Sequence, residues 1–209
     1  DRVFMDAIAK TLAALRPEVQ QKLAASGLVM PTIQMIFRRS NKQVQSDDDY
    51  LSGKAHPVVF QGRELDPVRM VKLAHEITEE TLPPVVLLKV VEEDQPVVGR
   101  DYFDVGPREQ LFTTPAAIAR VGRSVQQART MVVSAKDSKD LNDRPLTFHW
   151  VVLQGDPERI QITPQNDASS VVELSVQHHA RFPVSADSRM QTNRVDIAAF
   201  VHNGDYYSA

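Results

Sequence analysis

Hydrophobic positions at the start of the chain recur at the spacing of an α-helix. Phe4, Ile8, Leu12 and Leu15 lie three or four residues apart, so they share one face of an amphipathic helix. This periodicity and the helix signals that follow it predict a helical subdomain over residues 1–80.

Prolines and a glycine mark where further helices of this region begin and end. Pro17 and Pro31 each suit a first helical turn, and Gly27 stands where a C-terminal cap belongs. Asp66 followed by Pro67 combines an N-cap residue with proline at the first helical position. These signals predict helices beginning at each of the three prolines.

The pattern changes to that of β-strands after the helical region. Residues 85–91 form a run rich in β-branched side chains, which predicts a strand buried on both faces. Within 172–176 apolar and polar residues alternate, as in a strand with one buried face. Residues 81–127 are interpreted as this strand plus a connecting segment, and 128–209 as an antiparallel sandwich. Its strands are expected at 130–135, 146–153, 158–163, 170–177 and 194–201.

Composition excludes several classes of protein. The chain has 209 residues, and its 24 Lys and Arg against 27 Asp and Glu give a net charge of −3, which offers no general attraction for nucleic acid. The absence of cysteine excludes disulfides, thiolate nucleophiles and cysteine-based metal sites. No apolar run of about 18 residues is present, so no membrane span is expected.

Because Asp1 begins neither a signal peptide nor an ordinary translated chain, we expect a processed or truncated piece of a longer protein.

One segment resembles a known family. Ser134-Ala135 is followed by Asp140-Leu-Asn-Asp-Arg-Pro-Leu-Thr-Phe-His-Trp150, which resembles the start of PKD-type and cadherin-like bacterial sandwich repeats. Residues 195–209 resemble the penultimate strand of such repeats and its following turn. The resemblance covers about 128–209 and implies an Ig-like sandwich in which Trp150 is the buried tryptophan of the third strand. The predicted fold is therefore α+β, with a helical subdomain followed by an Ig-like antiparallel β-sandwich.

The chain departs from this family in two respects. Asp143 and Arg144 stand where the family has glycine and aspartate, and the chain stops where a closing edge strand would begin. An open sheet edge favours strand exchange, oligomer formation or pairing with another segment. Within the chain, residues 85–91 are the best candidate to pair with the edge of the strand at 194–201.

An aspartate-rich loop is the candidate metal site. Asp137, Asp140 and Asp143 are spaced by three, and Ca²⁺ takes about six to eight oxygen ligands. Arg144 places a cation beside them, and the Asp-x-Asp-x-Asp spacing is absent, so a solvated turn is the favoured interpretation. Calcium is the one cofactor that the sequence leaves open.

The candidate binding residues lie near the chain end. Tyr206 and Tyr207 stand beside Asn203 in a turn, where paired aromatic side chains can stack on sugars or on a partner protein. The alternative is a turn that packs against a further strand, and it is favoured. No catalytic residues are predicted, because Ser52 and His56 share a loop without a nucleophile motif.

These observations favour a binding protein over an enzyme. We expect a non-catalytic module that binds a protein or polysaccharide partner, or forms part of a surface assembly. The alternative is the accessory portion of a larger secreted hydrolase. Because most repeats of the resembled family are extracytoplasmic, a periplasmic, cell-surface or secreted location is expected.

Overall fold

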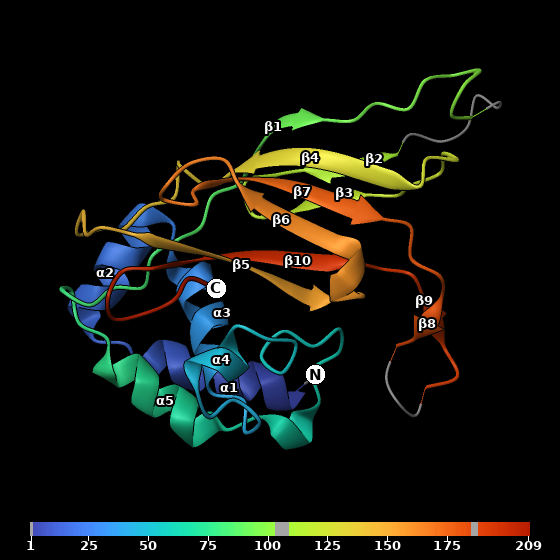
Figure 1. The fold of residues 1–209 in the computed structure, drawn as a ribbon. Coiled ribbons are helices and arrows are strands. Elements are labelled where there is room, and N and C mark those ends of the chain that lie inside the picture. The colour runs from blue at the N-terminus through green and yellow to red at the C-terminus, as the bar shows by residue number, and fades with distance from the viewer. Residues whose placement is uncertain (1, 103–108, 185–187) are drawn as a thin grey trace.

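The computed structural model describes residues 2–102, 109–184 and 188–209, and it has the α+β fold class that the sequence predicts. Helices come first in the chain, and antiparallel sheets follow them (Figure 1). Within the described ranges, no helix combines the length and the apolar character needed to cross a membrane. The helices are α1 (Arg2–Ala14), α2 (Pro17–Ser26), α3 (Val29–Arg39), α4 (Asp47–Tyr50) and α5 (Pro67–Glu76), with a 3₁₀ turn, η1, at Gly62–Glu64.

Local sequence signals account for most of the helix ends. Gly27 follows α2 in the left-handed region at φ +74°, and its N–H bonds back to the last turn. The Asp66 side chain accepts a hydrogen bond from the Arg69 N–H and so caps α5, with Pro67 as its first residue. Pro31 lies inside the first turn of α3, which begins two residues earlier than expected, at Val29. A proline is tolerated there because the first N–H groups of a helix have no internal partner.

The strands form a four-stranded sheet, a two-stranded sheet and two short hairpins. The larger sheet has the order β1-β4-β7-β6, the smaller one pairs β10 with β5, and the hairpins are β2-β3 and β8-β9. Every pairing between these strands is antiparallel. The strands are β1 (Lys89–Glu93), β2 (Gln110–Thr113), β3 (Ile118–Arg120), β4 (Ala128–Ser134), β5 (Thr147–Gln154), β6 (Ile160–Pro164), β7 (Val171–Gln177), β8 (Phe182–Pro183), β9 (Gln191–Thr192) and β10 (Asp196–His202), and a 3₁₀ turn, η2 (Pro157–Arg159), precedes β6.

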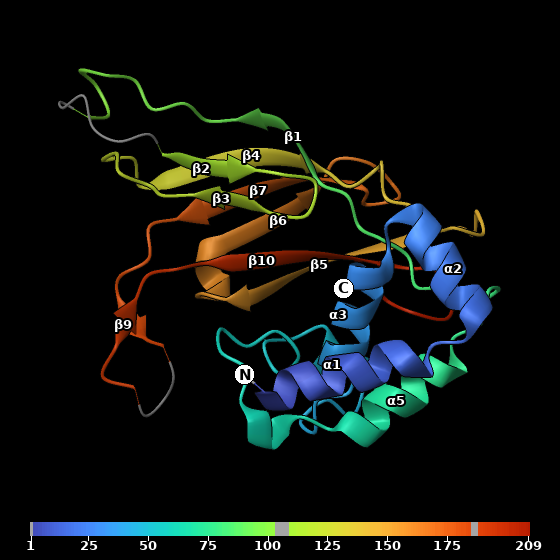
Figure 2. The same ribbon diagram turned by 180° about the vertical axis from the view of Figure 1, so that it is seen from behind.

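The small β5-β10 sheet lies between the helices and the four-stranded sheet (Figures 1 and 2). On its helix-facing side, Val151 lies opposite Ala198, and both pack against the helical core together with Phe200. Trp150 belongs to the opposite face because side chains alternate along a strand. Its indole N–H donates to the carbonyl oxygen of Ser169, 2.8 Å away in the loop between β6 and β7. Trp150 therefore connects the two sheets, and it is half-buried rather than fully enclosed.

The main hydrophobic core joins the helices to the end of the chain. Its fully buried side chains include Leu23 and Ile36 of the helices and Phe200 of β10, which is 1 % exposed. Tyr206 and Tyr207 pack against the same cluster. The helical layer is thus completed by side chains from the C-terminal strand.

The expectation that residues 85–91 pair with β10 is wrong. Lys89 and Val90 lie opposite Ser134 and Val133 of β4, in the other sheet. Val85 exchanges two backbone hydrogen bonds of 2.9 Å with Lys139, which fixes the segment beside β4 before the strand begins. Strand β1 starts and ends later than the predicted strand because these local bonds, not the apolar run, set its position.

The contacts of Trp150 predict how its substitution changes stability. Trp150→Phe removes the indole hydrogen bond and should lower the free energy of unfolding by about 1 kcal/mol. Trp150→Ala also removes the packing and should cost about 2–3 kcal/mol, below the usual range for a fully buried tryptophan. Urea denaturation measures both. A cost for Trp150→Ala of under about 1 kcal/mol would show that Trp150 does not hold the sheets together.

Candidate functional site

A hollow of about 230 Å³ lies between the helical layer and the turn that follows β10. We call it the junction pocket. Helices α3 and α4 supply one wall, and the last strand and its turn supply the other. Its lining residues are Met35, Arg39, Asp47, Tyr50, His202, Gly204, Asp205, Tyr206 and Tyr207.

The turn after β10 positions the two predicted tyrosines. The Asn203 side-chain oxygen accepts hydrogen bonds from the N–H groups of Asp205 and Tyr206, at 3.1 and 3.0 Å. Gly204 adopts φ +99°, a conformation that glycine reaches without strain. Asn203 is itself only 5 % exposed, so it shapes the turn and does not line the pocket.

Tyr206 and Tyr207 both line the junction pocket, and both also pack on the core. The ring of Tyr207 lies 4.4 Å from that of His202 and 5.3 Å from that of His149, measured between centroids. Burial raises the pKa of Tyr206, and nearby Glu76 and Asp205 raise it further. The two side chains pack on the helical core and not against a further strand, and their role in binding stays a prediction.

The charged groups of the junction pocket are paired. Arg39 forms an ion pair with Asp47, and its guanidinium carbon lies 5.3 Å from the centre of the Tyr50 ring. Asp205 is paired with Arg144. Burial is the largest influence on His202 and lowers its pKa, so its imidazole is neutral at pH 7. The pocket therefore presents hydrogen-bond donors and acceptors beside aromatic rings, with its charges balanced.

The buried Tyr50 holds α4 against the chain end, and the half-buried His56 is bonded to its backbone. The Tyr50 hydroxyl donates to the Ser208 carbonyl oxygen at 2.7 Å, and burial raises its pKa. The His56 ring nitrogen Nε2 lies 2.9 Å from the Tyr50 carbonyl oxygen and must donate to it. Burial, followed by the charge of Arg38, lowers the pKa of His56 to about 3. His56 is thus a neutral structural donor.

The loop that contains Ser52 and His56 holds no nucleophile–base pair in the described structure. The Ser52 hydroxyl donates to the Asp49 carbonyl oxygen at 2.8 Å, whereas the His56 ring donates to Tyr50. A serine nucleophile needs its hydroxyl hydrogen-bonded to the base that accepts its proton. Both side chains are therefore hydrogen-bonded to backbone carbonyl oxygens of this segment and not to each other.

The aspartate-rich loop is a structural connection. The Asp140 carboxylate is buried, and it accepts hydrogen bonds from the Asn142 and Arg144 N–H groups, at 2.8 and 3.2 Å, and from the Asn203 side chain. Asn203 also donates to the Leu82 carbonyl oxygen at 2.8 Å. Asp140 thereby joins its own loop to the end of the helical layer and to the C-terminal turn.

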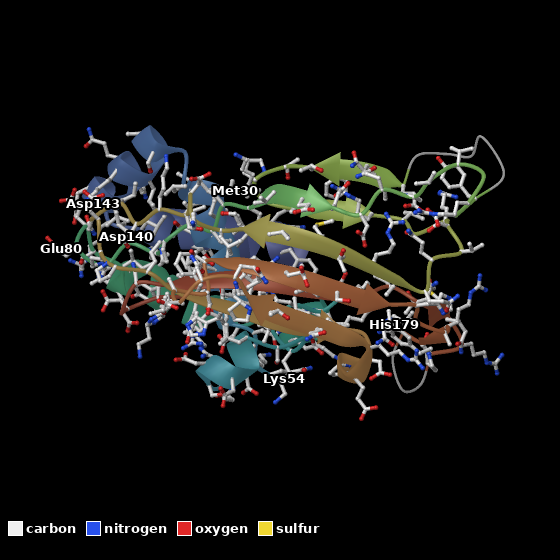
Figure 3. The ribbon with its side chains drawn as sticks, turned by 45° about the horizontal axis from the view of Figure 1, so that its top comes forward. Met30, Lys54, Glu80, Asp140, Asp143 and His179 are labelled. Carbon is white, nitrogen blue, oxygen red and sulfur yellow. The ribbon has the colours of Figure 1, made fainter. Side chains whose placement is uncertain are left out.

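The three aspartates considered as candidate calcium ligands do not converge. Asp140 is buried, whereas Asp137 and Asp143 are exposed. Figure 3 shows Asp140 and Asp143 at the same end of the molecule as Glu80, with His179 at the opposite end. In the part of the chain that the structure describes, no three Asp, Glu, His or Cys side chains are grouped so that they could hold a metal ion.

Sequence reasoning missed Arg39 and Asp47 as pocket residues and Asp140 as a connecting carboxylate. Arg39 and Asp47 are brought together with the C-terminal tyrosines only by the packing of α3 and α4 on β10. The capping signal at Ser46, which accepts a hydrogen bond from the Asp49 N–H, locates α4 but not its neighbours. A local pattern carries no information about contacts between segments so far apart.

The environment of Asp140 predicts a pH-dependent stability. Burial alone would raise the pKa of this carboxyl, but the hydrogen bonds from Asn203, Asn142 and Arg144 together outweigh it and lower the pKa. The stability that the carboxylate contributes is therefore present above its unfolded-state pKa and is lost as pH falls through the lower folded-state value. Asp140→Asn should cost about 1–3 kcal/mol at pH 7 and weaken the loss of stability on acidification.

The Asp140 prediction is measured by urea denaturation between pH 2 and pH 8. Asp137→Asn is the matched control, because Asp137 lies in the same loop but is exposed. Equal stability of Asp140→Asn and the parent at pH 7 would contradict the connecting role of Asp140.

The arrangement of the three aspartates predicts no response to calcium. Millimolar Ca²⁺ or a chelator should leave the Tm unchanged, because an ion stabilises a protein only if it binds the folded state more tightly than the unfolded one. Differential scanning calorimetry measures this. A calcium-dependent rise in Tm that is abolished by Asp143→Asn would establish the site after all.

Comparison of the chain with protein-family models, with curated proteins and with solved structures gives no match.

Proposed function

We propose that this protein is a non-catalytic, exported binding module whose junction pocket holds a sugar residue of a polysaccharide partner. The observation that carries the proposal is the meeting of Tyr206 and Tyr207 with the paired Arg39 and Asp47 around one hollow. Export is supported by the resemblance of residues 128–209 to extracytoplasmic repeats.

The chemistry of the pocket suits a neutral ligand rich in hydroxyl groups. A sugar hydroxyl both donates and accepts hydrogen bonds, and the pocket offers carboxylate acceptors, guanidinium and phenol donors. The apolar C–H groups of a sugar ring can pack on Tyr207 and Tyr206. A charged ligand fits less well, because it would have to compete with the existing ion pairs of Arg39 and Asp205.

The size of the pocket limits how much of the ligand it encloses. Its volume of about 230 Å³ is smaller than the roughly 300–1,000 Å³ of sites that enclose a drug-sized molecule. One sugar ring at a chain end or branch point is the unit that such a hollow would hold. The rest of the polysaccharide would lie outside it.

The same groups support binding rather than hydrolysis. Glycoside hydrolysis uses two carboxyl groups, one of which must be protonated to donate to the leaving oxygen. The carboxylates of the pocket, Asp47 and Asp205, each accept a hydrogen bond from an arginine. Both groups are thus engaged as hydrogen-bond acceptors of arginine, an arrangement that suits holding and orienting a ligand.

The proposal predicts that neutral oligosaccharides bind to the junction pocket. Isothermal titration with a panel of neutral β- and α-linked oligosaccharides should identify a ligand, and Asp47→Asn and Tyr206→Phe should each weaken its binding by about tenfold, as expected for loss of one hydrogen bond to the ligand. Asp48→Asn is the matched control, because Asp48 is the exposed neighbour of Asp47 and does not line the pocket.

The binding should not depend on pH between 6.5 and 8. His202 is the titratable lining group closest to this interval, and burial lowers its pKa and so moves its titration away from this interval. Binding restricted to charged saccharides, or to polypeptides, would overturn the proposal. So would binding that Asp47→Asn and Tyr206→Phe leave unchanged.

A further inference from the structure

The turn after β10 contains a chemically reactive pair of residues. Asn203 is the one asparagine of this sequence that is followed by glycine, Gly204. In such a pair the backbone nitrogen of the glycine can attack the side-chain carbon Cγ of the asparagine, because glycine has no Cβ that hinders the approach. A reaction there would matter to the whole fold, because the Asn203 side chain connects the C-terminal turn to Leu82 and Asp140.

The reaction of this pair is deamidation, and water is its co-reactant. The Gly204 nitrogen loses its proton and bonds to Cγ of Asn203, the Cγ–Nδ2 bond breaks, and Nδ2 leaves as ammonia with that proton. Water then opens the resulting five-membered succinimide ring at either of its carbonyl groups. The products carry aspartate or isoaspartate in place of Asn203, and nothing is oxidised or reduced.

In the folded chain, hydrogen bonds hold the Asn203 amide in place. The residue is 5 % exposed, and its Oδ1 accepts the N–H groups of Asp205 and Tyr206 at 3.1 and 3.0 Å. Its Nδ2 donates to the Leu82 carbonyl oxygen at 2.8 Å and to the Asp140 carboxylate. All four hydrogen-bonding positions of the amide are thus occupied. Ring closure needs the amide to turn toward the next backbone nitrogen, which breaks these bonds.

The attacking and the leaving nitrogen are also restrained. The Gly204 N–H donates to Nδ1 of His202 at 3.2 Å, so the turn must open before this nitrogen can move. The leaving nitrogen faces the Asp140 carboxylate. Burial raises the pKa of Asp140, but the hydrogen bonds that it accepts outweigh burial and lower this pKa. Asp140 is therefore ionised at neutral pH and has no proton to give to the departing ammonia.

We propose that Asn203-Gly204 is a deamidation site that folding protects, and that its conversion in the unfolded chain prevents the C-terminal turn from re-forming. The protecting hydrogen bonds are lost on unfolding, so the reaction proceeds only then. Unfolding thereby becomes irreversible with time, and the lifetime of the folded protein is set by how often it opens. Neither the protection nor its loss depends on whether the junction pocket binds a saccharide.

The products cannot repeat the contacts of the original amide. An aspartate at position 203 has no N–H to donate, so the Leu82 carbonyl oxygen and the Asp140 carboxylate would each face another acceptor. Two carboxylates in this buried place also repel each other. Isoaspartate adds a methylene to the backbone of the turn and so alters the path that places Tyr206 and Tyr207 on the core.

Incubating the folded and the unfolded 209-residue chain side by side at pH 8 tests the protection. Peptide mass mapping with enzymatic methylation of isoaspartate locates the conversion. The reaction at Asn203 should be at least about tenfold faster in guanidinium chloride than in buffer, because the folded chain must first open. Asn142 and Asn166, each followed by aspartate, are internal controls and should convert more slowly in the unfolded chain. Equal rates at Asn203 in the folded and the unfolded chain would overturn the proposal.

Variants of the surrounding residues show whether the hydrogen bonds give the protection. Asp140→Ala removes an acceptor of the Asn203 amide and should accelerate conversion in the folded chain severalfold. Asp137→Ala is the matched control, because Asp137 is exposed in the same loop. If Asp140→Ala does not fold, His202→Phe replaces it, since it removes the acceptor of the Gly204 N–H. Folded variants that convert at the parent rate would contradict the protecting role of these bonds.

The effect of conversion on refolding is tested with a variant that mimics the product. Asn203→Asp should lower the Tm by about 4–10 °C at pH 7, as expected for two lost hydrogen bonds. Adding Asp140→Asn to this variant returns a donor to the pair and should recover part of the loss, which is a coupling that separate structural defects do not show. In the parent chain, the fraction that refolds after incubation in guanidinium chloride should fall in step with conversion of Asn203. Refolding that stays complete after conversion, or an unchanged Tm in Asn203→Asp, would overturn the second half of the proposal.

Discussion

One buried side chain, that of Asn203, holds together segments that are far apart in the sequence. Its amide nitrogen donates to the Leu82 carbonyl oxygen and to the Asp140 carboxylate, while its oxygen accepts the N–H groups of the C-terminal turn. The end of the helical layer, the loop before β5 and the turn after β10 therefore meet at a single amide. A buried polar group of this kind is costly unless every hydrogen bond is made, so the three segments are constrained together.

The features of functional interest follow from that constraint. The turn that Asn203 shapes directs Tyr206 and Tyr207 toward Arg39 and Asp47, which creates the junction pocket. The same turn reverses the chain direction. As a result the Ser208 N–H donates to the Val201 carbonyl oxygen, and the Ser208 carbonyl oxygen accepts a hydrogen bond from the Tyr50 hydroxyl. The junction pocket and the short pairing of the chain end with β10 are thus two consequences of one reversal.

Residues 85–91 show what the pattern of apolar residues does not determine, because they lie beside β4 and not beside β10. The apolar run is a strand signal, but apolar character does not specify which sheet edge a strand joins. That choice was made by backbone hydrogen bonds between Val85 and Lys139, which place the segment beside β4. Trp150 was predicted to be enclosed between sheets and is half-buried instead, since it reaches across to Ser169 with its polar end. The Ig-like identity of the β region stays a prediction.

By itself, the sequence determined the α+β order, the caps at Gly27 and Asp66, and the approximate places of the strands, because these depend on spacings and turn residues within a few positions of each other. The sequence also indicated Tyr206 and Tyr207 as candidate binding residues in a turn near the chain end. Only the tertiary structure decided that Asn203 and Asp140 are buried connections and that Arg39 and Asp47 face the tyrosines. The physical reason is that the burial and pairing of a polar side chain depend on which distant segment packs against it, and a local pattern of residues does not contain that information.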